Sequence, residues 1–339
     1  MDKIYRIGSF NLRNIGVGAF ANSRNLEKIT NIILKEKMDV VALQEVLTDG
    51  KIFTKEDLPS SITKSNIITY LGGPDRWGFE WACSGDESIR HEGYAFLWNK
   101  DRLRLSSSQV TRNGRTFERI YSPRMIQTNG KNMKRKPYFA RFTPQGRQGG
   151  SSFEIRLLCV HTYFGDDNVA DRTVRQNEIQ TLLTDVYPQV SDRIFQNAMP
   201  SYTVLLGDYN AELVTEDNRK AVEERNVYRR QNKIRIPAVI STDGKGYVHS
   251  DKYGVDVVTV QDQLTTLKTK KELDSEEYLD RGYASNYDHF SYDKNAIGHV
   301  IKHKPRRIDA VRKYCGDDFE EYFKTISDHI PIIMELQIN

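Results

Sequence analysis

The sequence predicts an α+β fold in which two packed β-sheets carry helices on their outer faces. Short apolar runs of strand length recur from end to end of the 339-residue chain, whereas helical periodicity is clear in only two places. Strands that outnumber helices and are spread along a chain are typical of such sandwiches. No linker-like change of composition divides the chain, so we expect one domain over residues 1–339, with elaborations near residues 111–133 and 212–232.

The expected strands are compact apolar runs. They cover residues 5–10, 40–43, 94–98, 139–142, 155–160, 203–206, 255–260, 289–292 and 332–336. Helices are expected over residues 24–36 and 169–186, where apolar side chains recur at helical spacing, and a weaker, mostly polar helix over residues 216–228. The Gly- and Ser-bearing stretch 145–152 is expected to form a hairpin loop.

The composition indicates an ordinary globular protein, because 38% of the residues are hydrophobic and 28% are charged. Cys83, Cys159 and Cys315 have no paired spacing, which argues against a disulfide framework or a zinc cluster and favours a reducing compartment. The first residues hold no apolar signal core, and no run approaches the roughly 18 apolar residues of a membrane span. We therefore expect a cytoplasmic protein, with signal-independent export as the alternative.

Positive charge is concentrated in two stretches, although the net charge is only +4. The stretch 112–147 has the single acid Glu118 against Arg112, Arg115, Arg119, Arg124, Lys131, Lys134, Arg135, Lys136, Arg141 and Arg147. For this stretch binding to a phosphate backbone is favoured over solvated loop charge. The second cluster is Lys302, Lys304, Arg306 and Arg307, for which the two interpretations have equal weight.

Polar side chains stand at the ends of several expected strands, next to buried runs. They are Asn11, Glu45, His161, Asp208, Asn210, Asp328 and His329. Each alone is explained by a turn, a helix cap or a structural histidine. So many acid–base or metal-ligand groups beside buried runs are hard to explain by capping alone, because such groups are costly to bury unless they are paired or bind a metal.

These residue types indicate metal-assisted hydrolysis of a phosphoester. Oxygen ligands without cysteine select a hard cation, Mg²⁺ first, with Mn²⁺ or Ca²⁺ as alternatives. Histidines beside the ion can donate to a phosphate oxygen or move a proton at neutral pH. Asp208 and Asn210 are two residues apart on an extended segment, so both side chains point to one side and can address one reactive centre.

Four short stretches, in the expected order, resemble the signature of the DNase I-like endonuclease/exonuclease/phosphatase superfamily. They are Ser9-Phe10-Asn11, Leu43-Gln44-Glu45, Gly207-Asp208-Tyr209-Asn210 and Ser327-Asp328-His329. The resemblance runs from residue 9 to residue 329, which is nearly the whole chain. Each stretch alone is a moderate signal, and together they are a strong one. The resemblance implies a four-layer α/β/β/α sandwich of two mostly antiparallel sheets.

The resemblance also implies a role for each site residue. Glu45 would be the main metal ligand, helped by Asn11, with Asp328 beside or on the metal. Asp208 would activate or orient the attacking water, and Asn210 would hold the water and the phosphate. His329 would contact the scissile phosphate while its other nitrogen pairs with Asp288, and His161 would contact the phosphate from the other side.

Two looser matches complete the expected site. Glu92, just before the strand 94–98, resembles a glutamate that supports the first histidine in DNase I-like nucleases. Arg135 resembles a phosphate-binding arginine. An ordinary loop acid or loop cation is the alternative in each case.

Taken together, these features predict a Mg²⁺-dependent nuclease, an endonuclease acting on DNA more readily than on RNA. The stretch 205–211 is closest to the DNase I-like branch, which also has a histidine where His161 stands, and the insertion before Arg135 is basic. The main alternative is a phosphatase or phosphodiesterase acting on an inositol phosphate, a phospholipid headgroup or another small phosphoester. Against a sphingomyelinase, the sequence shows no secretion signal and no exposed aromatic hairpin. A non-catalytic nucleic-acid-binding module is a distant third possibility, since every principal position carries a competent residue.

Overall fold

The structure is a computed structural model that describes residues 3–16, 24–47, 67–84, 92–128, 133–146, 153–166, 168–192, 199–259, 263–268 and 282–338. Lys131, Arg147 and most of the loop predicted at 145–152 lie outside the described residues.

Two mixed sheets form the centre of the described structure. The first has the strand order β17 (Ile301–Arg307), β18 (Ile332–Ile338), β1 (Lys3–Gly16), β2 (Val40–Leu47), β4 (Glu92–Asn99) and β3 (Trp77–Cys83). The second has the order β14 (Tyr247–Ser250), β15 (Val255–Thr259), β16 (Asp288–Asp293), β11 (Ser201–Asp208), β10 (Glu154–His161), β9 (Tyr138–Pro144) and β5 (Leu103–Leu105), with β8 (Arg124–Met125) on β9. Short strands β12 (Ala211–Leu213) and β13 (Ala238–Ile240) pair separately.

Each sheet contains one parallel pair of strands in an otherwise antiparallel arrangement. In the first sheet β1 runs parallel to β2, with Asn11 opposite Gln44. In the second, β10 runs parallel to β11, with His161 opposite Asp208. Because parallel neighbours end at the same edge of a sheet, each pair brings its C-terminal residues together.

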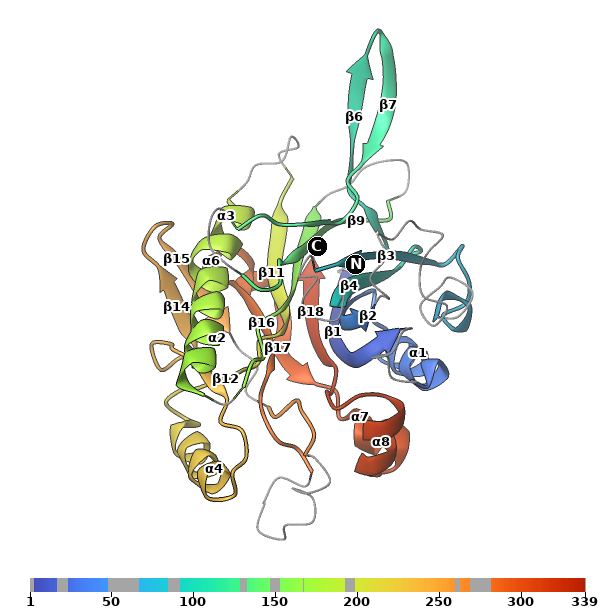
Figure 1. The fold of residues 1–339 in the computed structure, drawn as a ribbon. Coiled ribbons are helices and arrows are strands. Elements are labelled where there is room, and N and C mark those ends of the chain that lie inside the picture. The colour runs from blue at the N-terminus through green and yellow to red at the C-terminus, as the bar shows by residue number, and fades with distance from the viewer. Residues whose placement is uncertain are drawn as a thin grey trace.

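Helices cover the outer face of both sheets, which gives the predicted α/β/β/α layers (Figure 1). The helices over the first sheet are α1 (Leu26–Lys35), α7 (Ala310–Cys315) and α8 (Phe319–Thr325). Those over the second are α2 (Val169–Thr181), the π-helical turn η3 (Leu182–Val186) and α3 (Tyr187–Ser191). The remaining helices are α4 (Arg219–Gln231), α6 (Lys294–Ile297) and the 3₁₀ turn η4 (Gly298–Val300).

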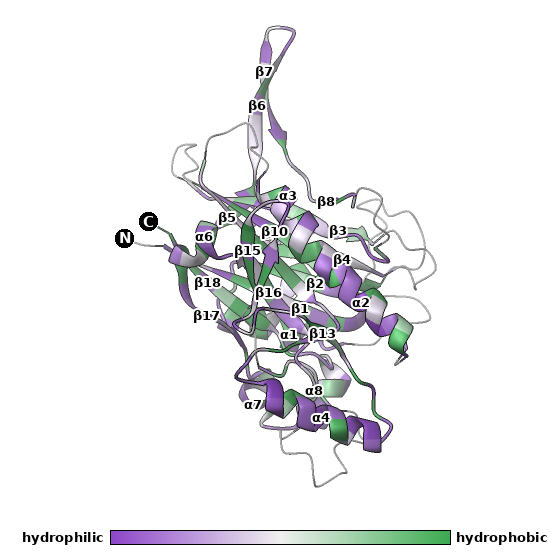
Figure 2. Cartoon of the chain, turned by 90° about the vertical axis from the view of Figure 1, so that its left-hand side faces the viewer, coloured by the Kyte–Doolittle hydropathy of each residue, from purple (hydrophilic) through white to green (hydrophobic). Residues whose placement is uncertain are grey.

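The alternation along β2 shows how the sequence builds these layers. Val40 and Ala42 pack between the two sheets, whereas Val41 and Leu43 pack under α1 and the C-terminal helices. Side chains alternate between the faces of a strand, so a continuous apolar run is what a strand buried on both faces requires. Figure 2 shows the hydrophobic colour concentrated in the strands and α4 mostly hydrophilic.

The predicted elements agree with the structure to within a few residues, except at residue 260, which lies outside the described residues. The helix expected over 24–36 is α1, which begins after Asn25, whose side chain accepts from the Lys28 amide at 3.0 Å. The helix expected over 169–186 is α2 followed by η3, and the weak helix at 216–228 is α4. The C-terminal helices α7 and α8, the seven-residue strands β3 and β17, and several shorter strands were not predicted. No described helix has the length and apolar character that a membrane span needs.

The basic stretch before Arg135 contains an exposed hairpin. The prediction that the chain has no exposed aromatic hairpin, which counted against a sphingomyelinase, is wrong. Strands β6 (Ser107–Arg112) and β7 (Arg115–Ile120) pair antiparallel and project from the sandwich, on the side away from α4, α7 and α8 (Figures 1 and 2). The turn is Asn113-Gly114 with both residues at positive φ, the combination that a type I′ hairpin turn requires. Phe117 and Ile120 are about half exposed, at 47% and 58%, so an exposed aromatic hairpin is present.

Candidate active site

The predicted site residues meet where the parallel strand pairs of the two sheets end. In the first sheet, Asn11 lies within β1, where its regular pairing with β2 is interrupted by a bulge, and Glu45 lies near the end of β2. His161 and Asp208 are the last residues of β10 and β11 in the second. The sandwich therefore places four polar side chains from four strands at one end of the interface between its sheets.

The side-chain amide of Asn11 connects the sheets. Its Nδ2 atom donates to Glu45 Oε1 at 2.9 Å and to Asp208 Oδ2 at 3.0 Å, and its Oδ1 atom accepts from the Arg13 amide at 2.9 Å. Asn11 is fully buried. In the described structure it thus orients two carboxylates, and its predicted role as a metal ligand remains a prediction.

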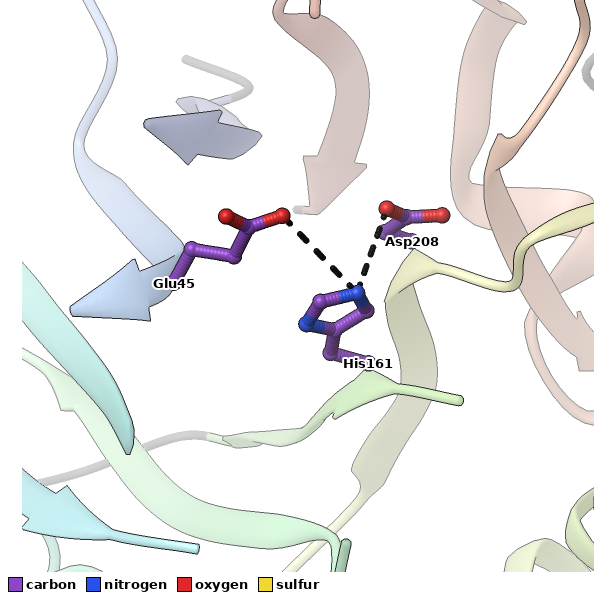
Figure 3. Close-up of side chains that lie close together, drawn as sticks. All are labelled: Glu45, His161 and Asp208. Carbon is purple, nitrogen blue, oxygen red and sulfur yellow. Dashed lines mark ion pairs between the residues drawn. The ribbon is translucent and has the colours of Figure 1, made fainter. Parts of the chain in front are cut away.

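Glu45, His161 and Asp208 form a group that could hold a metal ion. Figure 3 shows the three side chains pointing toward one another, and one ligand atom from each lies within 4.8 Å of the others. His161 Nε2 is 3.5 Å from Asp208 Oδ2 and 3.9 Å from Glu45 Oε1. Burial raises the pKa of Glu45, as do the carboxylates of Glu92 and Asp328, although His161 opposes them.

The donor set fits a hard divalent cation. Two carboxylates converge with only a shared amide donor between them, and a cation would offset the electrostatic cost of bringing them together. Asp328, predicted beside the metal, pairs with Arg13 at 3.2 Å through Oδ2. Its Oδ1 atom is buried and has no hydrogen-bond partner among the described residues, so an oxygen ligand is available there.

His161 is held from behind by a buried carboxylate. Its Nδ1 atom contacts Glu92 Oε1, and the Glu92 side chain is only 6% exposed. Burial alone would raise the pKa of Glu92, but the charges of His161 and Arg135 outweigh it and lower that pKa to about 2. The pairing fixes the imidazole so that Nε2 faces Asp208 and Glu45.

Arg135 lines the same cavity. The sequence predicted that it binds phosphate, and the structure shows that its guanidinium also binds two groups of the protein. Its Nη2 atom donates to Glu92 Oε2 and its Nη1 atom to the Thr162 carbonyl, each at 2.9 Å. Arg135 is 6% exposed. In this structure the guanidinium positions the carboxylate that positions His161, while its predicted contact with phosphate stays a prediction.

The second histidine is held in the same way. His329 Nδ1 lies 2.8 Å from Asp288 Oδ2, the pairing that the resemblance implied, and His329 Nε2 lies 3.6 Å from Asp208 Oδ2. Burial lowers the pKa of His329, but the carboxylates of Asp288 and Asp208 outweigh it and raise that pKa well above its ordinary value. His289, the residue after Asp288, is not part of this pair, because its Nε2 atom contacts the carbonyls of Ala211 and Asn286.

Asp208 and Asn210 both line the cavity, but not along the extended segment that was predicted, because β11 ends at Asp208 and the chain turns there. The Asn210 amide donates to Asp208 Oδ1 at 2.8 Å, and Asn210 Nδ2 donates to the Thr162 carbonyl at 3.0 Å. Asn210 has φ +47°, a conformation that asparagine tolerates better than most residues. The turn after β11 therefore presents both polar side chains at the same place.

The site opens into a cavity of about 960 Å³. The predicted residues that line it are Glu45, Glu92, Arg135, His161, Asp208, Asn210, Asp328 and His329. Asn11 and Asp288 are not part of its wall and hold lining residues from behind. The arrangement places two histidines and several carboxylates around one space large enough for part of a phosphodiester chain.

Comparisons with known proteins agree with this architecture. Truncated TDP2 from Caenorhabditis elegans is similar with a TM-score of 0.51 and 14% sequence identity, covering 99% of this chain and 98% of that one. An endonuclease/exonuclease/phosphatase family protein from Bacteroides thetaiotaomicron has a TM-score of 0.48 and 12% identity, covering 100% and 99%. The human Nocturnin catalytic domain with bound sulfate has a TM-score of 0.44 and 13% identity, covering 98% and 96%. No protein-family model and no curated protein sequence matches the chain.

The chain has the DNase I-like fold, which it shares with truncated TDP2 from Caenorhabditis elegans. At this level of identity the likeness concerns the fold, and the site must be argued from the residues of this chain.

Within this DNase I-like fold, sequence reasoning missed two residues that shape the site. Glu178, on the buried face of α2, accepts from the amides of Lys134 and Tyr163, each at 2.7 Å, and so fixes the segments that carry Arg135 and follow His161. The signal in the sequence for Glu178 was an acidic residue on the apolar face of the helix predicted over 169–186. Arg13 enters the cavity wall because β1 has a bulge where Arg13 and Asn14 adopt positive φ, a feature that no sequence pattern announced.

Proposed function

We propose that this protein is a divalent-metal-dependent phosphodiester hydrolase that acts on nucleic acid, on DNA more readily than on RNA. One observation carries the proposal: Glu45, His161 and Asp208 converge in the wall of the same cavity as His329, which Asp288 holds from behind. Carboxylates that can hold a hard cation, combined with histidines aimed at one point, suit hydrolysis of a phosphoester.

The cation, once bound, would polarise a phosphoryl oxygen and offset negative charge that develops on it. Glu45 would be the main ligand, with the predicted ligands Asn11 and Asp328 close by, and Asp208 and His161 would lie beside it. Mg²⁺ is the first candidate because most of these donors are oxygen atoms.

The two histidines supply paired donors for the phosphate. Each is bound at Nδ1 by a buried carboxylate, His161 by Glu92 and His329 by Asp288, so each presents Nε2 toward Asp208. The raised pKa values of both rings, which their carboxylate partners cause against the effect of burial, keep them able to donate to phosphate oxygens.

Asp208 and Asn210 position the attacking water. Asp208 Oδ2 stands between the two histidines, at 3.5 Å and 3.6 Å from their Nε2 atoms, so it can take a hydrogen bond from a water aimed at the phosphorus. Asn210 steadies Asp208 through its backbone amide and lines the same space. Proton abstraction or orientation by Asp208 would raise the reactivity of that water.

The basic hairpin projects from the end of the sandwich opposite the cavity, so it would bind nucleic acid at a distance from the catalytic site. Arg112 and Arg115 face each other beside its turn, and Arg119 lies two positions from Phe117 on the same face. All three are exposed. Arginines on a projecting two-stranded ribbon are suited to contact the phosphates that line a groove.

A phospholipid substrate is the second candidate, because the same hairpin exposes Phe117 and Ile120. Hydrolysis assays with Mg²⁺ on duplex DNA, single-stranded DNA, single-stranded RNA and phospholipid vesicles separate the two candidates. Cleavage of a nucleic acid that Asp208→Asn abolishes supports the proposal, whereas hydrolysis confined to the vesicles would replace nucleic acid with a lipid headgroup as substrate.

A further inference from the structure

An aromatic ring stands exposed in the wall of the catalytic cavity. Phe164 lies three residues after His161, lines the same cavity as the site residues, and is 46% exposed. A single exposed apolar side chain on an outer surface needs no explanation. Phe164 differs because its exposed ring borders the space in which the scissile phosphate would lie.

The backbone that carries this ring is held by two arginines from different segments. The Phe164 carbonyl accepts from Arg235 Nη2 at 2.7 Å and from Arg175 Nη1, and Arg175 is 1% exposed. The next residue, Gly165, has φ +55°, and a Cβ atom there would lie within 2.8 Å of the side chains of Tyr163 and Asp171. The sequence thus builds a fixed turn under the exposed ring instead of leaving the ring on a loosely held loop.

Arg235 stacks on one face of the Phe164 ring. Its guanidinium carbon lies 3.4 Å from the centroid of the Phe164 ring, the distance of a stacked cation–π contact. Arg235 reaches this place from the segment after α4, just beyond the predicted elaboration near 212–232, and its neighbours Lys233 and Ile234 also line the cavity. Positive charge therefore covers one face of the ring, and a base would stack on the opposite face of the ring or on the outer face of the guanidinium.

We propose that Phe164 and Arg235 form a base-stacking subsite that binds a nucleobase next to the scissile phosphate, with Lys233 near an adjoining phosphate. This inference rests on the proposed function. Every nucleobase has a flat π-face that stacks on aromatic rings and on guanidinium planes. An inositol ring or a phospholipid headgroup lacks such a face, so this subsite would favour nucleic acid over both.

The test compares two single strands of equal length, oligo-dT and the same backbone with a base-free tetrahydrofuran residue in place of every thymidine. For the wild type with Mg²⁺ we expect a higher kcat/KM on oligo-dT. Phe164→Ala should lower the ratio of the two kcat/KM values by about tenfold, mainly through KM on oligo-dT, because stacking stabilises bound substrate and transition state alike. Phe164→Tyr should preserve the ratio.

Controls separate stacking from a loss of structure. Tyr70→Ala removes an aromatic side chain that is 51% exposed and is not part of the described cavity wall, and it should leave the ratio unchanged. If Phe164→Ala unfolds, Phe164→Leu carries the test, because it keeps an apolar side chain and removes the π-face. If folded Phe164→Ala or Phe164→Leu has the same ratio of the two kcat/KM values as the wild type, the subsite is overturned and the proposed function stands. If the wild type cleaves neither strand, the proposed function is overturned as well.

Discussion

The side-chain nitrogen of Asn11 lies 3.0 Å from Oδ2 of Asp208, although 197 residues separate them and they belong to different sheets. The same nitrogen donates to Glu45, so one amide holds together two acids that would otherwise repel each other. The site therefore exists only when the two sheets are packed in register.

Asn11→Ala removes the donor that Glu45 and Asp208 share and leaves both acids with one fewer partner in a buried place. We expect the free energy of unfolding to fall by about 1–3 kcal/mol in metal-free protein. Denaturant unfolding with and without Mg²⁺ measures this, and the loss should be smaller with the ion because a bound cation would offset the repulsion. Equal stability of variant and wild type in EDTA would contradict the role given to Asn11.

Asp208→Asn and His329→Ala should each lower hydrolysis by about 10²-fold or more, because each removes a group that acts at the phosphate or on the water. Single-turnover rates measure the effect. Circular dichroism should show that both variants fold, since neither change removes an apolar residue of the core. Full activity in either folded variant would remove that residue from the mechanism.

Arg135→Ala leaves Glu92 buried without its arginine partner. We expect a loss of about 3–5 kcal/mol in stability and a fall in kcat beyond the loss of folded protein, because His161 loses its fixed orientation. Arg141→Ala is the matched control. Arg141 pairs with the buried Glu154 at a distance of 2.8 Å, and neither residue is part of the described cavity wall. Arg141→Ala should lower stability without lowering kcat of the folded fraction. A folded Arg135→Ala protein with unchanged kcat would show that the Glu92–His161 pair needs no such support.

The hairpin arginines should govern the salt dependence of nucleic-acid binding. Replacing Arg112, Arg115 and Arg119 together by Gln should weaken duplex binding and reduce the slope of log K against log salt by about 0.9 for each lost phosphate contact. Lys302, Lys304 and Arg306, exposed on β17, offer a control with the same change in net charge. An equal effect of both triple variants would assign the binding to general charge and not to the hairpin.

Glu36 should make stability depend on acid pH. Burial raises its pKa, but hydrogen bonds from Lys313 and Tyr314 outweigh burial and hold the pKa below its ordinary value. A depressed carboxyl pKa stabilises the fold above the unfolded pKa, and that stabilisation is lost as the pH falls below it. Glu36→Gln should therefore cost about 1 kcal/mol at pH 7 and much less at pH 3.5 in denaturant unfolding. A cost that is the same at both pH values would contradict this.

Much of the fold could be predicted from sequence because its central strands are buried on both faces. Runs such as 40–43 and 155–160 leave little alternative to a buried strand, and the polar residues that end them marked the site. The contact between His329 and Asp288, which the resemblance implied, is present in the structure.

What the sequence did not predict depends on contacts between distant segments. The exposed hairpin was missed although Asn113-Gly114 is a strong turn signal, because the stretch was interpreted through its charge alone. Arg135 was expected to face phosphate, and its contacts with Glu92 and Thr162 depend on how three strands meet. The bulge that brings Arg13 into the cavity, and the stacking of Arg235 on Phe164, likewise arise from packing across the sandwich.

The most direct test of the central claim is hydrolysis of supercoiled plasmid DNA by the wild type and by Asp208→Asn, with Mg²⁺, with Mn²⁺ and with EDTA. We predict nicking by the wild type with either metal, none in EDTA, and none by folded Asp208→Asn. Nicking that persists in EDTA or in Asp208→Asn would contradict a metal-dependent site built on Glu45, His161 and Asp208.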